Sequence, residues 1–276
     1  MKLAKITTIL LGLVMSLNVV AGDNSIYVNQ SGDNATVTIT QDGAGNAVRG
    51  IQGSGSGNTT PAVINGNNNN VIVDQVGTGN TLNFGVQTSV ANGVTGGNSY
   101  SYTINGNNST ATIDSNANGS GSSASNSVSV TQTGDSSIAS VNVLGSTNSV
   151  SATTAGGSNN AFYSTVNGNS NTQSVNVSGG GNNTVTVNQG IGGSAVTGGQ
   201  SATTNNNGSA TITVIGASNT VNVSQTSAGY SDTTVIALNG SSNTVGVVQN
   251  ASAGNTVVNL QSQGSNNVFN IHSNAH

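Results

Sequence analysis

One seven-residue pattern, Asn-x-Val-x-Val-x-Gln, recurs along the chain and constrains what it can fold into. It occurs strictly at residues 69–75, 126–132, 183–189, 219–225 and 243–249, with looser copies at 46–52 and 255–261. In a β-strand alternate side chains share one face, so the Asn, both Val and the Gln of a copy point the same way. The pattern therefore predicts strands whose buried face carries amides beside valines.

The copies follow a frame that is clearest near the C-terminus. Segments beginning at Gly216, Gly240 and Gly264 lie 24 residues apart, and each opens Gly-x-x-Asn before apolar and polar residues alternate. Gly and Asn tolerate the positive φ of tight turns. Two strands with two such turns fill about 24 residues, so we predict an all-β fold, a cross-β-like β-solenoid of stacked strand–turn–strand coils. The expected turn glycines are Gly32, Gly43, Gly66, Gly77, Gly145, Gly168, Gly216, Gly240 and Gly264.

Some coils must be longer than this frame. Gly66 and Gly106 are 40 residues apart, and residues 190–209 interrupt the frame. A third short strand, for which 99–105 is a candidate, or a protruding loop would each account for the extra length. A disordered low-complexity tract is the alternative to a solenoid, and a β-sandwich would need more large apolar residues.

Buried amides make physical sense only when the coils lie in register. A lone buried amide costs about 1–3 kcal/mol, but Asn or Gln stacked on its own copy about 4.8 Å away can donate to one neighbour and accept from the other. A ladder of this kind also fixes the register, because a slip by one residue would expose it. The candidate ladder residues are Asn46, Gln52, Asn69, Gln75, Asn126, Gln132, Asn183, Gln189, Asn219, Gln225, Asn243, Gln249, Asn255 and Gln261.

The first 22 residues are typical of a secretory signal peptide. Lys2 and Lys5 precede an apolar stretch, and small residues around Ala21 and Gly22 fit a cleavage site. The stretch is interrupted by polar residues and is shorter than the roughly 20 apolar residues that a membrane anchor needs. We therefore expect a signal peptide over residues 1–22 and a single repeat domain over 23–276.

Charge is scarce in this sequence, with 4% charged residues against about 25% in an ordinary domain. Without the signal, Arg49 and seven Asp leave a net charge of 1 − 7 = −6 with His neutral. This balance argues against binding to nucleic acid or anionic lipid, and we expect no membrane insertion once the signal is removed. The chain has no Cys, so we expect backbone pairing and stacking, not disulfides, to stabilise it.

A second spacing, Gln-x-Gly-x-x-Asn, links the end of one strand to the start of the next. QDGAGN at 41–46 and QVGTGN at 75–80 match it fully, while 132–137 replaces the Asn by Ser. With the signal and the inward amides, this spacing resembles the curlin repeat family, whose members are subunits of curli, the functional amyloid fibres of Gram-negative bacterial surfaces. The resemblance implies export through an outer-membrane secretion pore, a nucleator subunit as a further partner, and self-templated assembly outside the cell.

No constellation of catalytic residues is recognisable, so we expect neither an enzyme nor a cofactor. His272 and His276 in the tail lack the Cys or Glu partners of a usual metal site. The leading hypothesis is a secreted, extracellular structural protein that polymerises with itself into amyloid-type fibres of a biofilm matrix and serves surface adhesion. The alternative is a monomeric solenoid adhesin or ice-binding module, because outward positions are rich in Ser and Thr, namely Thr36, Thr38, Thr40, Thr184, Thr186 and Thr220.

Overall fold

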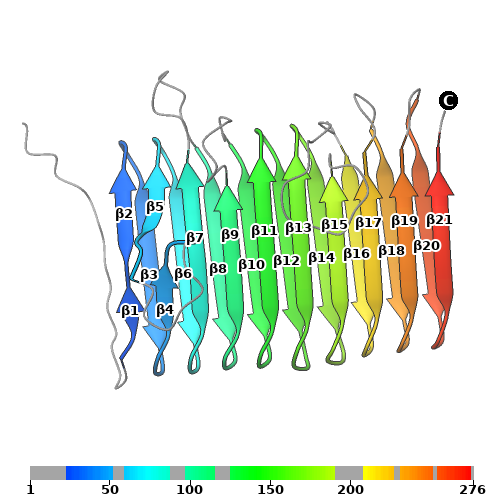
Figure 1. Ribbon diagram of the computed structural model, residues 1–276, viewed down its shortest axis with the longest axis horizontal. Coiled ribbons are helices and arrows are strands. Elements are labelled where there is room, and N and C mark those ends of the chain that lie inside the picture. The colour runs from blue at the N-terminus through cyan, green and yellow to red at the C-terminus, as the bar shows by residue number, and fades with distance from the viewer. Residues whose placement is uncertain are drawn as a thin grey trace, which may run out of the picture.

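The computed structural model describes residues 23–51, 59–87, 97–115, 125–189, 208–226, 231–250 and 254–274. In these ranges the chain is all-β, and its strands form two parallel sheets stacked face to face (Figure 1). The β-solenoid prediction is confirmed. The predicted signal peptide, residues 1–22, lies outside the described residues, as do Gln52 and His276.

Sheet A contains the strand that opens each coil. Its strands are β1 (Ser25–Ile26), β2 (Val28–Ser31), β4 (Ala47–Arg49), β5 (Ala62–Asn65), β7 (Thr81–Gln87), β9 (Thr110–Ser115), β11 (Ile138–Leu144), β13 (Ala161–Asn167), β15 (Thr184–Gln189), β17 (Thr220–Gln225), β19 (Thr244–Gln249) and β21 (Val268–Ser273). β1 pairs with β4 while β2 pairs with β5. The β1–β2 pair and the β4–β5 pair therefore each make one layer, and the sheet has ten layers.

Sheet B contains the strand that closes each coil. Its nine strands are β3 (Thr36–Asp42), β6 (Asn70–Val76), β8 (Ser99–Asn105), β10 (Ser127–Thr133), β12 (Ser149–Ala155), β14 (Thr172–Ser178), β16 (Ser209–Ile215), β18 (Thr233–Asn239) and β20 (Val257–Gln263). The two sheets run in opposite directions, as the upward β11 and downward β12 of Figure 1 show.

Coil length varies because of residues inserted after sheet A strands or within one of them. Successive sheet A layers begin at residues 25, 47, 81, 110, 138, 161, 184, 220, 244 and 268, at intervals of 22, 34, 29, 28, 23, 23, 36, 24 and 24. The return from sheet B to sheet A takes only four or five residues in every coil. Residues 99–105, the candidate third strand, form β8, an ordinary strand of sheet B. In the described ranges the longer coils that begin at β7, β9 and β15 have two strands each, whereas the coil that begins at β4 has three, because β4 and β5 share its sheet A layer.

Each tight connection is an arch that opens with glycine. All nine predicted turn glycines have positive φ, from 109° at Gly145 to 147° at Gly240. The third arch residue is left-handed, as at Asn68 (φ 58°) and Ser242 (φ 58°). A Cβ on Gly240 would lie 1.9 Å from the carbonyl oxygen of Gly264 in the next arch. Glycine is therefore required twice, by its own φ and by the arch stacked on it.

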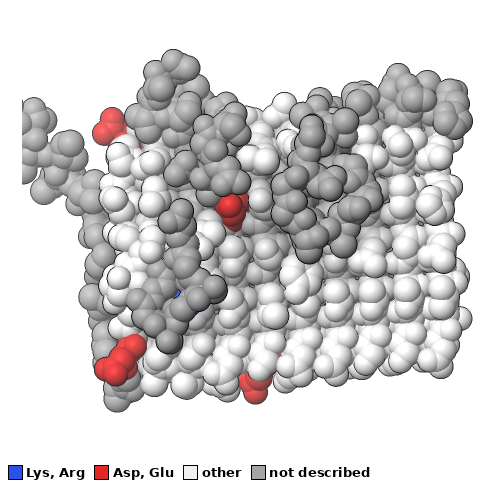
Figure 2. All heavy atoms as spheres, in the orientation of Figure 1, with Lys and Arg blue, Asp and Glu red and all other residues white. Residues whose placement is uncertain are grey.

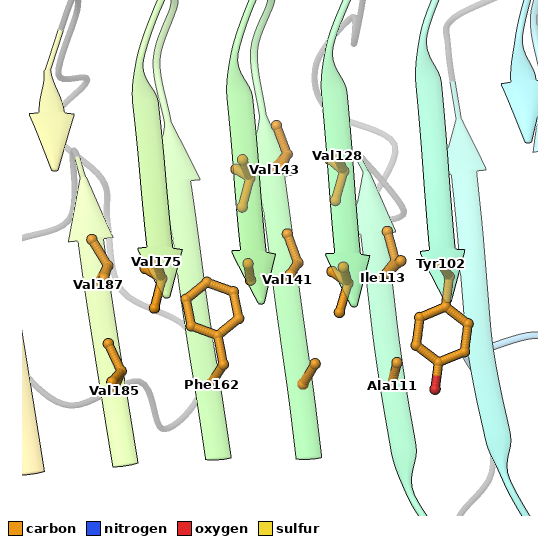
Figure 3. Packing of buried hydrophobic residues seen from close by; sticks show 14 of the residues in the cluster. Tyr102, Ala111, Ile113, Val128, Val141, Val143, Phe162, Val175, Val185 and Val187 are labelled. Carbon is orange, nitrogen blue, oxygen red and sulfur yellow. The ribbon is translucent and has the colours of Figure 1, made fainter. Parts of the chain in front are cut away.

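The core fills the narrow space between the sheets, where the side chains of both sheets meet (Figure 3). Valines and isoleucines dominate it, and large residues stack on small ones. Phe162 stacks on Ala139, and Leu82 stacks on Ala111. Phe84 and Tyr100 meet edge to face at 5.3 Å between ring centroids. This alternation keeps the two sheets evenly spaced while the interior stays close-packed.

Candidate functional site: the inward amide ladders

A ladder of amides runs along sheet A at the residue that directly precedes each strand. In the second half of the stack, successive layers of sheet A all have Asn at this position. Asn219 donates from its backbone N and its Nδ2 to Asn183 Oδ1, each at 3.0 Å. Asn243 donates to Asn219 Oδ1 in the same way, and Asn267 donates likewise to Asn243 Oδ1. One side-chain oxygen thus accepts both donors of the rung above.

The ladder also ties each rung to the arch of the following coil. Asn219 Nδ2 donates to the carbonyl oxygen of Gly240 at 2.9 Å, and Asn183 Nδ2 donates to that of Gly216 at 2.8 Å. The buried amide is satisfied by its copy on one side and by an arch on the other, so it incurs little of the cost of a lone buried amide.

Serine replaces asparagine in two coils of sheet A, and only Ser109 keeps the contact pattern, because Ser137 Oγ is buried and no group in the described ranges bonds it. Ser109 accepts the backbone N–H of Ser137 at its Oγ, at 3.0 Å, and donates that Oγ to the carbonyl oxygen of Gly134 at 3.2 Å. In the described ranges, the rungs of this sheet are Asn24, Asn46, Asn80, Ser109, Ser137, Asn160, Asn183, Asn219, Asn243 and Asn267.

A second ladder occupies the corresponding position in sheet B. Asn126 donates its backbone N to Asn98 Oδ1 and accepts that of Asn148 at its own Oδ1, both at 2.9 Å. The asparagine rungs are Asn69, Asn98, Asn126, Asn148 and Asn171. Gly208 follows and still donates its backbone N to Asn171 Oδ1, which shows that the acceptor needs only a backbone partner.

The sheet B ladder changes character at its C-terminal end. Asp232 and Thr256 take the last two rung positions, and Thr256 Oγ1 donates to Asp232 Oδ1 at 2.6 Å. Asp232 is fully buried, and no group in the described ranges bonds its Oδ2.

The glutamines form two short runs instead of one long ladder. In sheet B, Gln41 Nε2 donates to Gln75 Oε1 at 2.8 Å. In sheet A, Gln189 donates to Gln225 at 2.8 Å and Gln225 donates to Gln249 at 2.9 Å. Three successive strict copies of the seven-residue pattern, 183–189, 219–225 and 243–249, therefore stack in consecutive layers, and their Gln residues pair as expected.

Gln132 is buried but has no glutamine above or below it. Its strand neighbours are Ile104 and Thr154. Its Oε1 accepts the hydroxyl of Tyr102 at 3.1 Å, whereas no group in the described ranges bonds its Nε2. Burial raises the pKa of Tyr102 far above its usual value. The strict copy at 126–132 thus supplies an Asn rung but not a Gln rung.

The assignment of Asn255 and Gln261 to the ladder is wrong, because both are exposed. β20 pairs with β18 in the register Thr234 with Val258 and Ala237 with Gln261. The inward positions of β20 are therefore Thr256, Val258, Leu260 and Ser262. The loose copy 255–261 has adjacent valines, and the second of them, not the first, faces the core.

Several rungs were not among the predicted residues because no closing Gln follows them at the required spacing. Asn80, Asn148, Asn171 and Asn267 each stand three residues after an arch glycine, so the simpler Gly-x-x-Asn spacing finds them. Asn98 has no such glycine, and the sequence carries no local signal for it. Asn46, Asn69, Asn126, Asn183, Asn219 and Asn243 are all buried, as are Gln75, Gln132, Gln189, Gln225 and Gln249.

The curlin-like spacing is the spacing of one arch. In 41–46, Gln41 is the last inward residue of β3, Gly43 opens the arch, and Asn46 is the first inward residue of the next layer. Residues 75–80 repeat this from β6 to β7, where Asn80 Nδ2 donates to the carbonyl oxygen of Gly106 at 2.8 Å. The motif therefore encodes a crossing from sheet B to sheet A.

Charged and metal-binding groups are sparse on this scaffold. Within the described ranges no three His, Cys, Asp or Glu side chains gather closely enough to hold a metal ion, and no helix is long and apolar enough to cross a membrane. Residues 136–231 contain no Asp, Glu, Lys or Arg. Figure 2 shows scattered acidic atoms and a trace of basic ones on this face.

Fold and ladders together define a class, the two-sheet parallel β-solenoid with stacked inward amides. No family model matches the sequence, and neither a curated protein nor a solved structure matches it. The function of this chain is therefore inferred from its own geometry.

Proposed function

We propose that this protein is a secreted structural subunit that assembles coil on coil into extracellular, amyloid-type fibres, as curli subunits do. The observation that carries the proposal is the in-register stacking of inward Asn rungs, of which every coil that the structure describes has at least one. An Asn rung bonds the Asn stacked on it, as Asn243 bonds Asn219, so a contact of the same kind can be made between two chains as well as within one.

The two ends of the described stack support this proposal. β21 and β20 are the outermost strands at one end, and the inward side chains Phe269 and Ile271 of β21 are only half-buried. β1, β2 and β3 form the other end. Outermost strands of a parallel stack present backbone N–H and C=O groups that template pairing, and no charged side chain points inward along β20 or β21.

In this proposal the partners are further copies of the chain, a nucleator subunit and an outer-membrane secretion pore. The location is the cell surface of a Gram-negative-type bacterium, where fibres would build a biofilm matrix and support adhesion. The sparse charge favours such packing, because few charged side chains oppose the approach of identical surfaces by electrostatic repulsion.

The test is assembly of purified residues 23–276. We expect fibres within days that bind thioflavin T and give a meridional reflection at about 4.7–4.8 Å, the strand spacing of parallel sheets. Protein that stays monomeric at high concentration, with no thioflavin response and no such reflection, would overturn the proposal.

One observation favours a second candidate, a monomeric adhesin or ice-binding module. The outer face of sheet B carries rows of small hydroxyl side chains over five consecutive layers, interrupted at Asn176, whereas the sheet A rows are interrupted at Asn188, Asn222 and Gly246. Of the outward threonines predicted, Thr36, Thr38 and Thr40 lie on β3 of sheet B. The hydroxyl rows of the five layers are Ser99, Ser101, Thr103, Ser127, Ser129, Thr131, Ser149, Ser151, Thr153, Thr172, Ser174, Ser209, Thr211 and Thr213.

Inhibition of ice recrystallisation by the monomer separates the two candidates. If the sheet B face orders water, Ser129→Tyr in the middle of the array should abolish inhibition. Thr186→Tyr, the matched change on the outer face of sheet A, should leave it intact. Absence of inhibition by the unmodified monomer would remove the ice-binding candidate.

A further inference from the structure

The strands of the two sheets interleave by half a layer. Gln225 Nε2 on β17 donates to the carbonyl oxygen of Ser209 on β16 at 3.0 Å and to Thr234 Oγ1 on β18 at 3.2 Å. A sheet A strand thus lies between two successive strands of sheet B. Thr234 Oγ1 also donates to Gln249 Oε1 on β19, so β18 in turn lies between β17 and β19.

Because of this stagger, each end of the described stack is a step. Sheet A has ten layers and sheet B has nine, and sheet A supplies the outermost layer at both ends. β21 therefore projects beyond β20 at one end, and β1 with β2 projects beyond β3 at the other. Each step is half of the strand spacing, about 2.4 Å high.

Stacking sheet A on sheet A would bring the two projecting layers together. β21 would pair with β1 and β2, but β20 and β3 would then lie two strand spacings apart, about 9.6 Å. The backbone groups facing that gap would have no strand to pair with, and unpaired buried backbone groups are costly. This arrangement leaves one strand missing from sheet B at every junction.

A half-turn about the stack axis removes the gap. The rotation exchanges the positions of the two sheets and reverses the strand direction, and the sheets already run in opposite directions (Figure 1). β1 and β2 then add to β20 as a parallel layer, and β3 adds to β21, so each step fits into the other. We propose that successive copies in the fibre are related by this half-turn, with each sheet A continuing as the next copy's sheet B. This inference rests on the proposed fibre function.

The side chains at the half-turn junction match in register. Counting from the rung position of each strand, apolar residues meet apolar residues and polar residues meet polar ones. The inward pairs are Ile26 on Val258, Val28 on Leu260, Gln30 on Ser262, Val37 on Phe269, Ile39 on Ile271 and Gln41 on Ser273.

The last acceptor of the sheet A ladder also finds a backbone donor at this junction. Asn267 Oδ1 is the last acceptor of the sheet A ladder, and the residue that would stack on it is Ala35. Alanine has no side-chain amide, but Gly208 shows that a backbone N–H alone satisfies such an acceptor, because it donates to Asn171 Oδ1 at 2.9 Å.

Cysteine cross-linking tests the half-turn, and the absence of Cys from the chain makes the assay clean. Val268 is the first outward residue of β21 and is 67% exposed. It would adjoin Thr36 of the next copy in the half-turn junction but Ser25 if sheet A stacked on sheet A. Neighbouring strands place such pairs within disulfide range. The two variants to compare are V268C/T36C and V268C/S25C.

Both variants are assembled into fibres, oxidised mildly and run on a non-reducing denaturing gel. Positions 36 and 268 lie at opposite ends of one chain, so covalent multimers report junctions only. We expect a ladder of multimers from V268C/T36C and at most dimers from V268C/S25C. The reverse result, or fibres that cross-link in neither variant, would overturn the half-turn while leaving the fibre proposal intact. Failure of the unmodified protein to form fibres would instead overturn the proposed function.

Discussion

Asn243 donates both its backbone N–H and its side-chain Nδ2 to a single oxygen, Oδ1 of Asn219, each at 3.0 Å. The two residues are one coil apart, 24 positions in sequence. The contact repeats at every rung of this half of sheet A. Each Asn therefore positions both the backbone at the end of the arch and its own buried side chain. Stacking and register are thereby fixed together.

The first prediction follows from the chemistry of one rung. In Asn219→Asp, the carboxylate would keep the oxygen that accepts from Asn243, but it would lose the two hydrogen bonds that Asn219 Nδ2 donates. It would then face the former acceptors of these bonds, Asn183 Oδ1 and the carbonyl oxygen of Gly240. A buried charge among acceptors should lower the free energy of unfolding by about 3 kcal/mol or more. Gln225→Leu removes only neutral hydrogen bonds, among them the one from Gln189 Nε2, which keeps the carbonyl oxygen of Thr172 as an acceptor, and should cost about 1–3 kcal/mol.

Urea unfolding of freshly purified monomer measures both changes. The order is the decisive result: Asn219→Asp must be clearly more destabilising than Gln225→Leu at pH 7, and its fibres should form more slowly. Equal effects would show that the Asn position is not the more constrained one. If both variants matched the unmodified protein, the ladder would have no energetic role.

The strand–turn frame was predictable because its signals are local. Glycine at the arch opening and Asn three residues later are set by positive φ and by the first inward position, as at Gly240 and Asn243. Such requirements repeat in each coil regardless of which strand lies next to it. The frame was hidden only where residues are inserted, as between β7 and β8.

Contacts between coils were less predictable, because the same alternating pattern suits either sheet. The copies at 69–75 and 126–132 lie in sheet B, whereas the three later ones lie in sheet A. Gln132 consequently meets Ile104 and Thr154 instead of another glutamine. At 255–261, adjacent valines allow two inward registers, and pairing with β18 selects the one that exposes Gln261.

The second prediction concerns the stacked arch glycines. Gly240→Ala would place a Cβ 1.9 Å from the carbonyl oxygen of Gly264, at a φ of 147°. Neither strain can relax without moving the neighbouring arch, so the loss of stability should be about 3 kcal/mol or more. Gly254→Ala is the matched control, because its φ is 83° but no atom lies within 4 Å of the added Cβ.

In the control, Gly254→Ala, the free energy of unfolding should fall by only about 1 kcal/mol, the usual cost of a left-handed non-glycine residue. Urea denaturation midpoints of the two variants provide the comparison. Similar losses in both would mean that φ alone, and not the close approach of successive arches, makes glycine necessary at position 240.

The third prediction concerns fibre growth at the β21 end. Ile271→Lys places an ammonium group on the half-buried inward face of the outermost strand, where the monomer can still solvate it. A second copy would have to bury the charge, so elongation from seeds should slow at least tenfold, the equivalent of about 1.4 kcal/mol. Asn270→Lys, on the outward face of the same strand, should leave elongation nearly unchanged.

Thioflavin kinetics with fixed seeds measure elongation, and circular dichroism checks that both monomers keep their β-structure. Elongation of Ile271→Lys at the rate of the unmodified protein would contradict growth through this end. A matching loss in Asn270→Lys would point to a general effect of charge on the fibre surface.

The last prediction concerns Tyr102, whose pKa burial raises well above that of an unfolded tyrosine. The folded state therefore holds the neutral phenol, and this stabilising contribution is complete below the unfolded pKa of about 10. It is lost as pH rises further, by about 1.4 kcal/mol at one pH unit above that value.

Tyr102→Phe cannot ionise, but it leaves Gln132 Oε1 without its donor and should cost about 1–3 kcal/mol at pH 7. Unfolding free energies at pH 7 and pH 11 should show the gap between the two proteins narrowing by about 1.4 kcal/mol, whereas the outward-facing control Tyr163→Phe should shift neither value. A gap that stays constant across this range would show that water reaches the Tyr102 hydroxyl and that the interior between β8 and β10 is not closed.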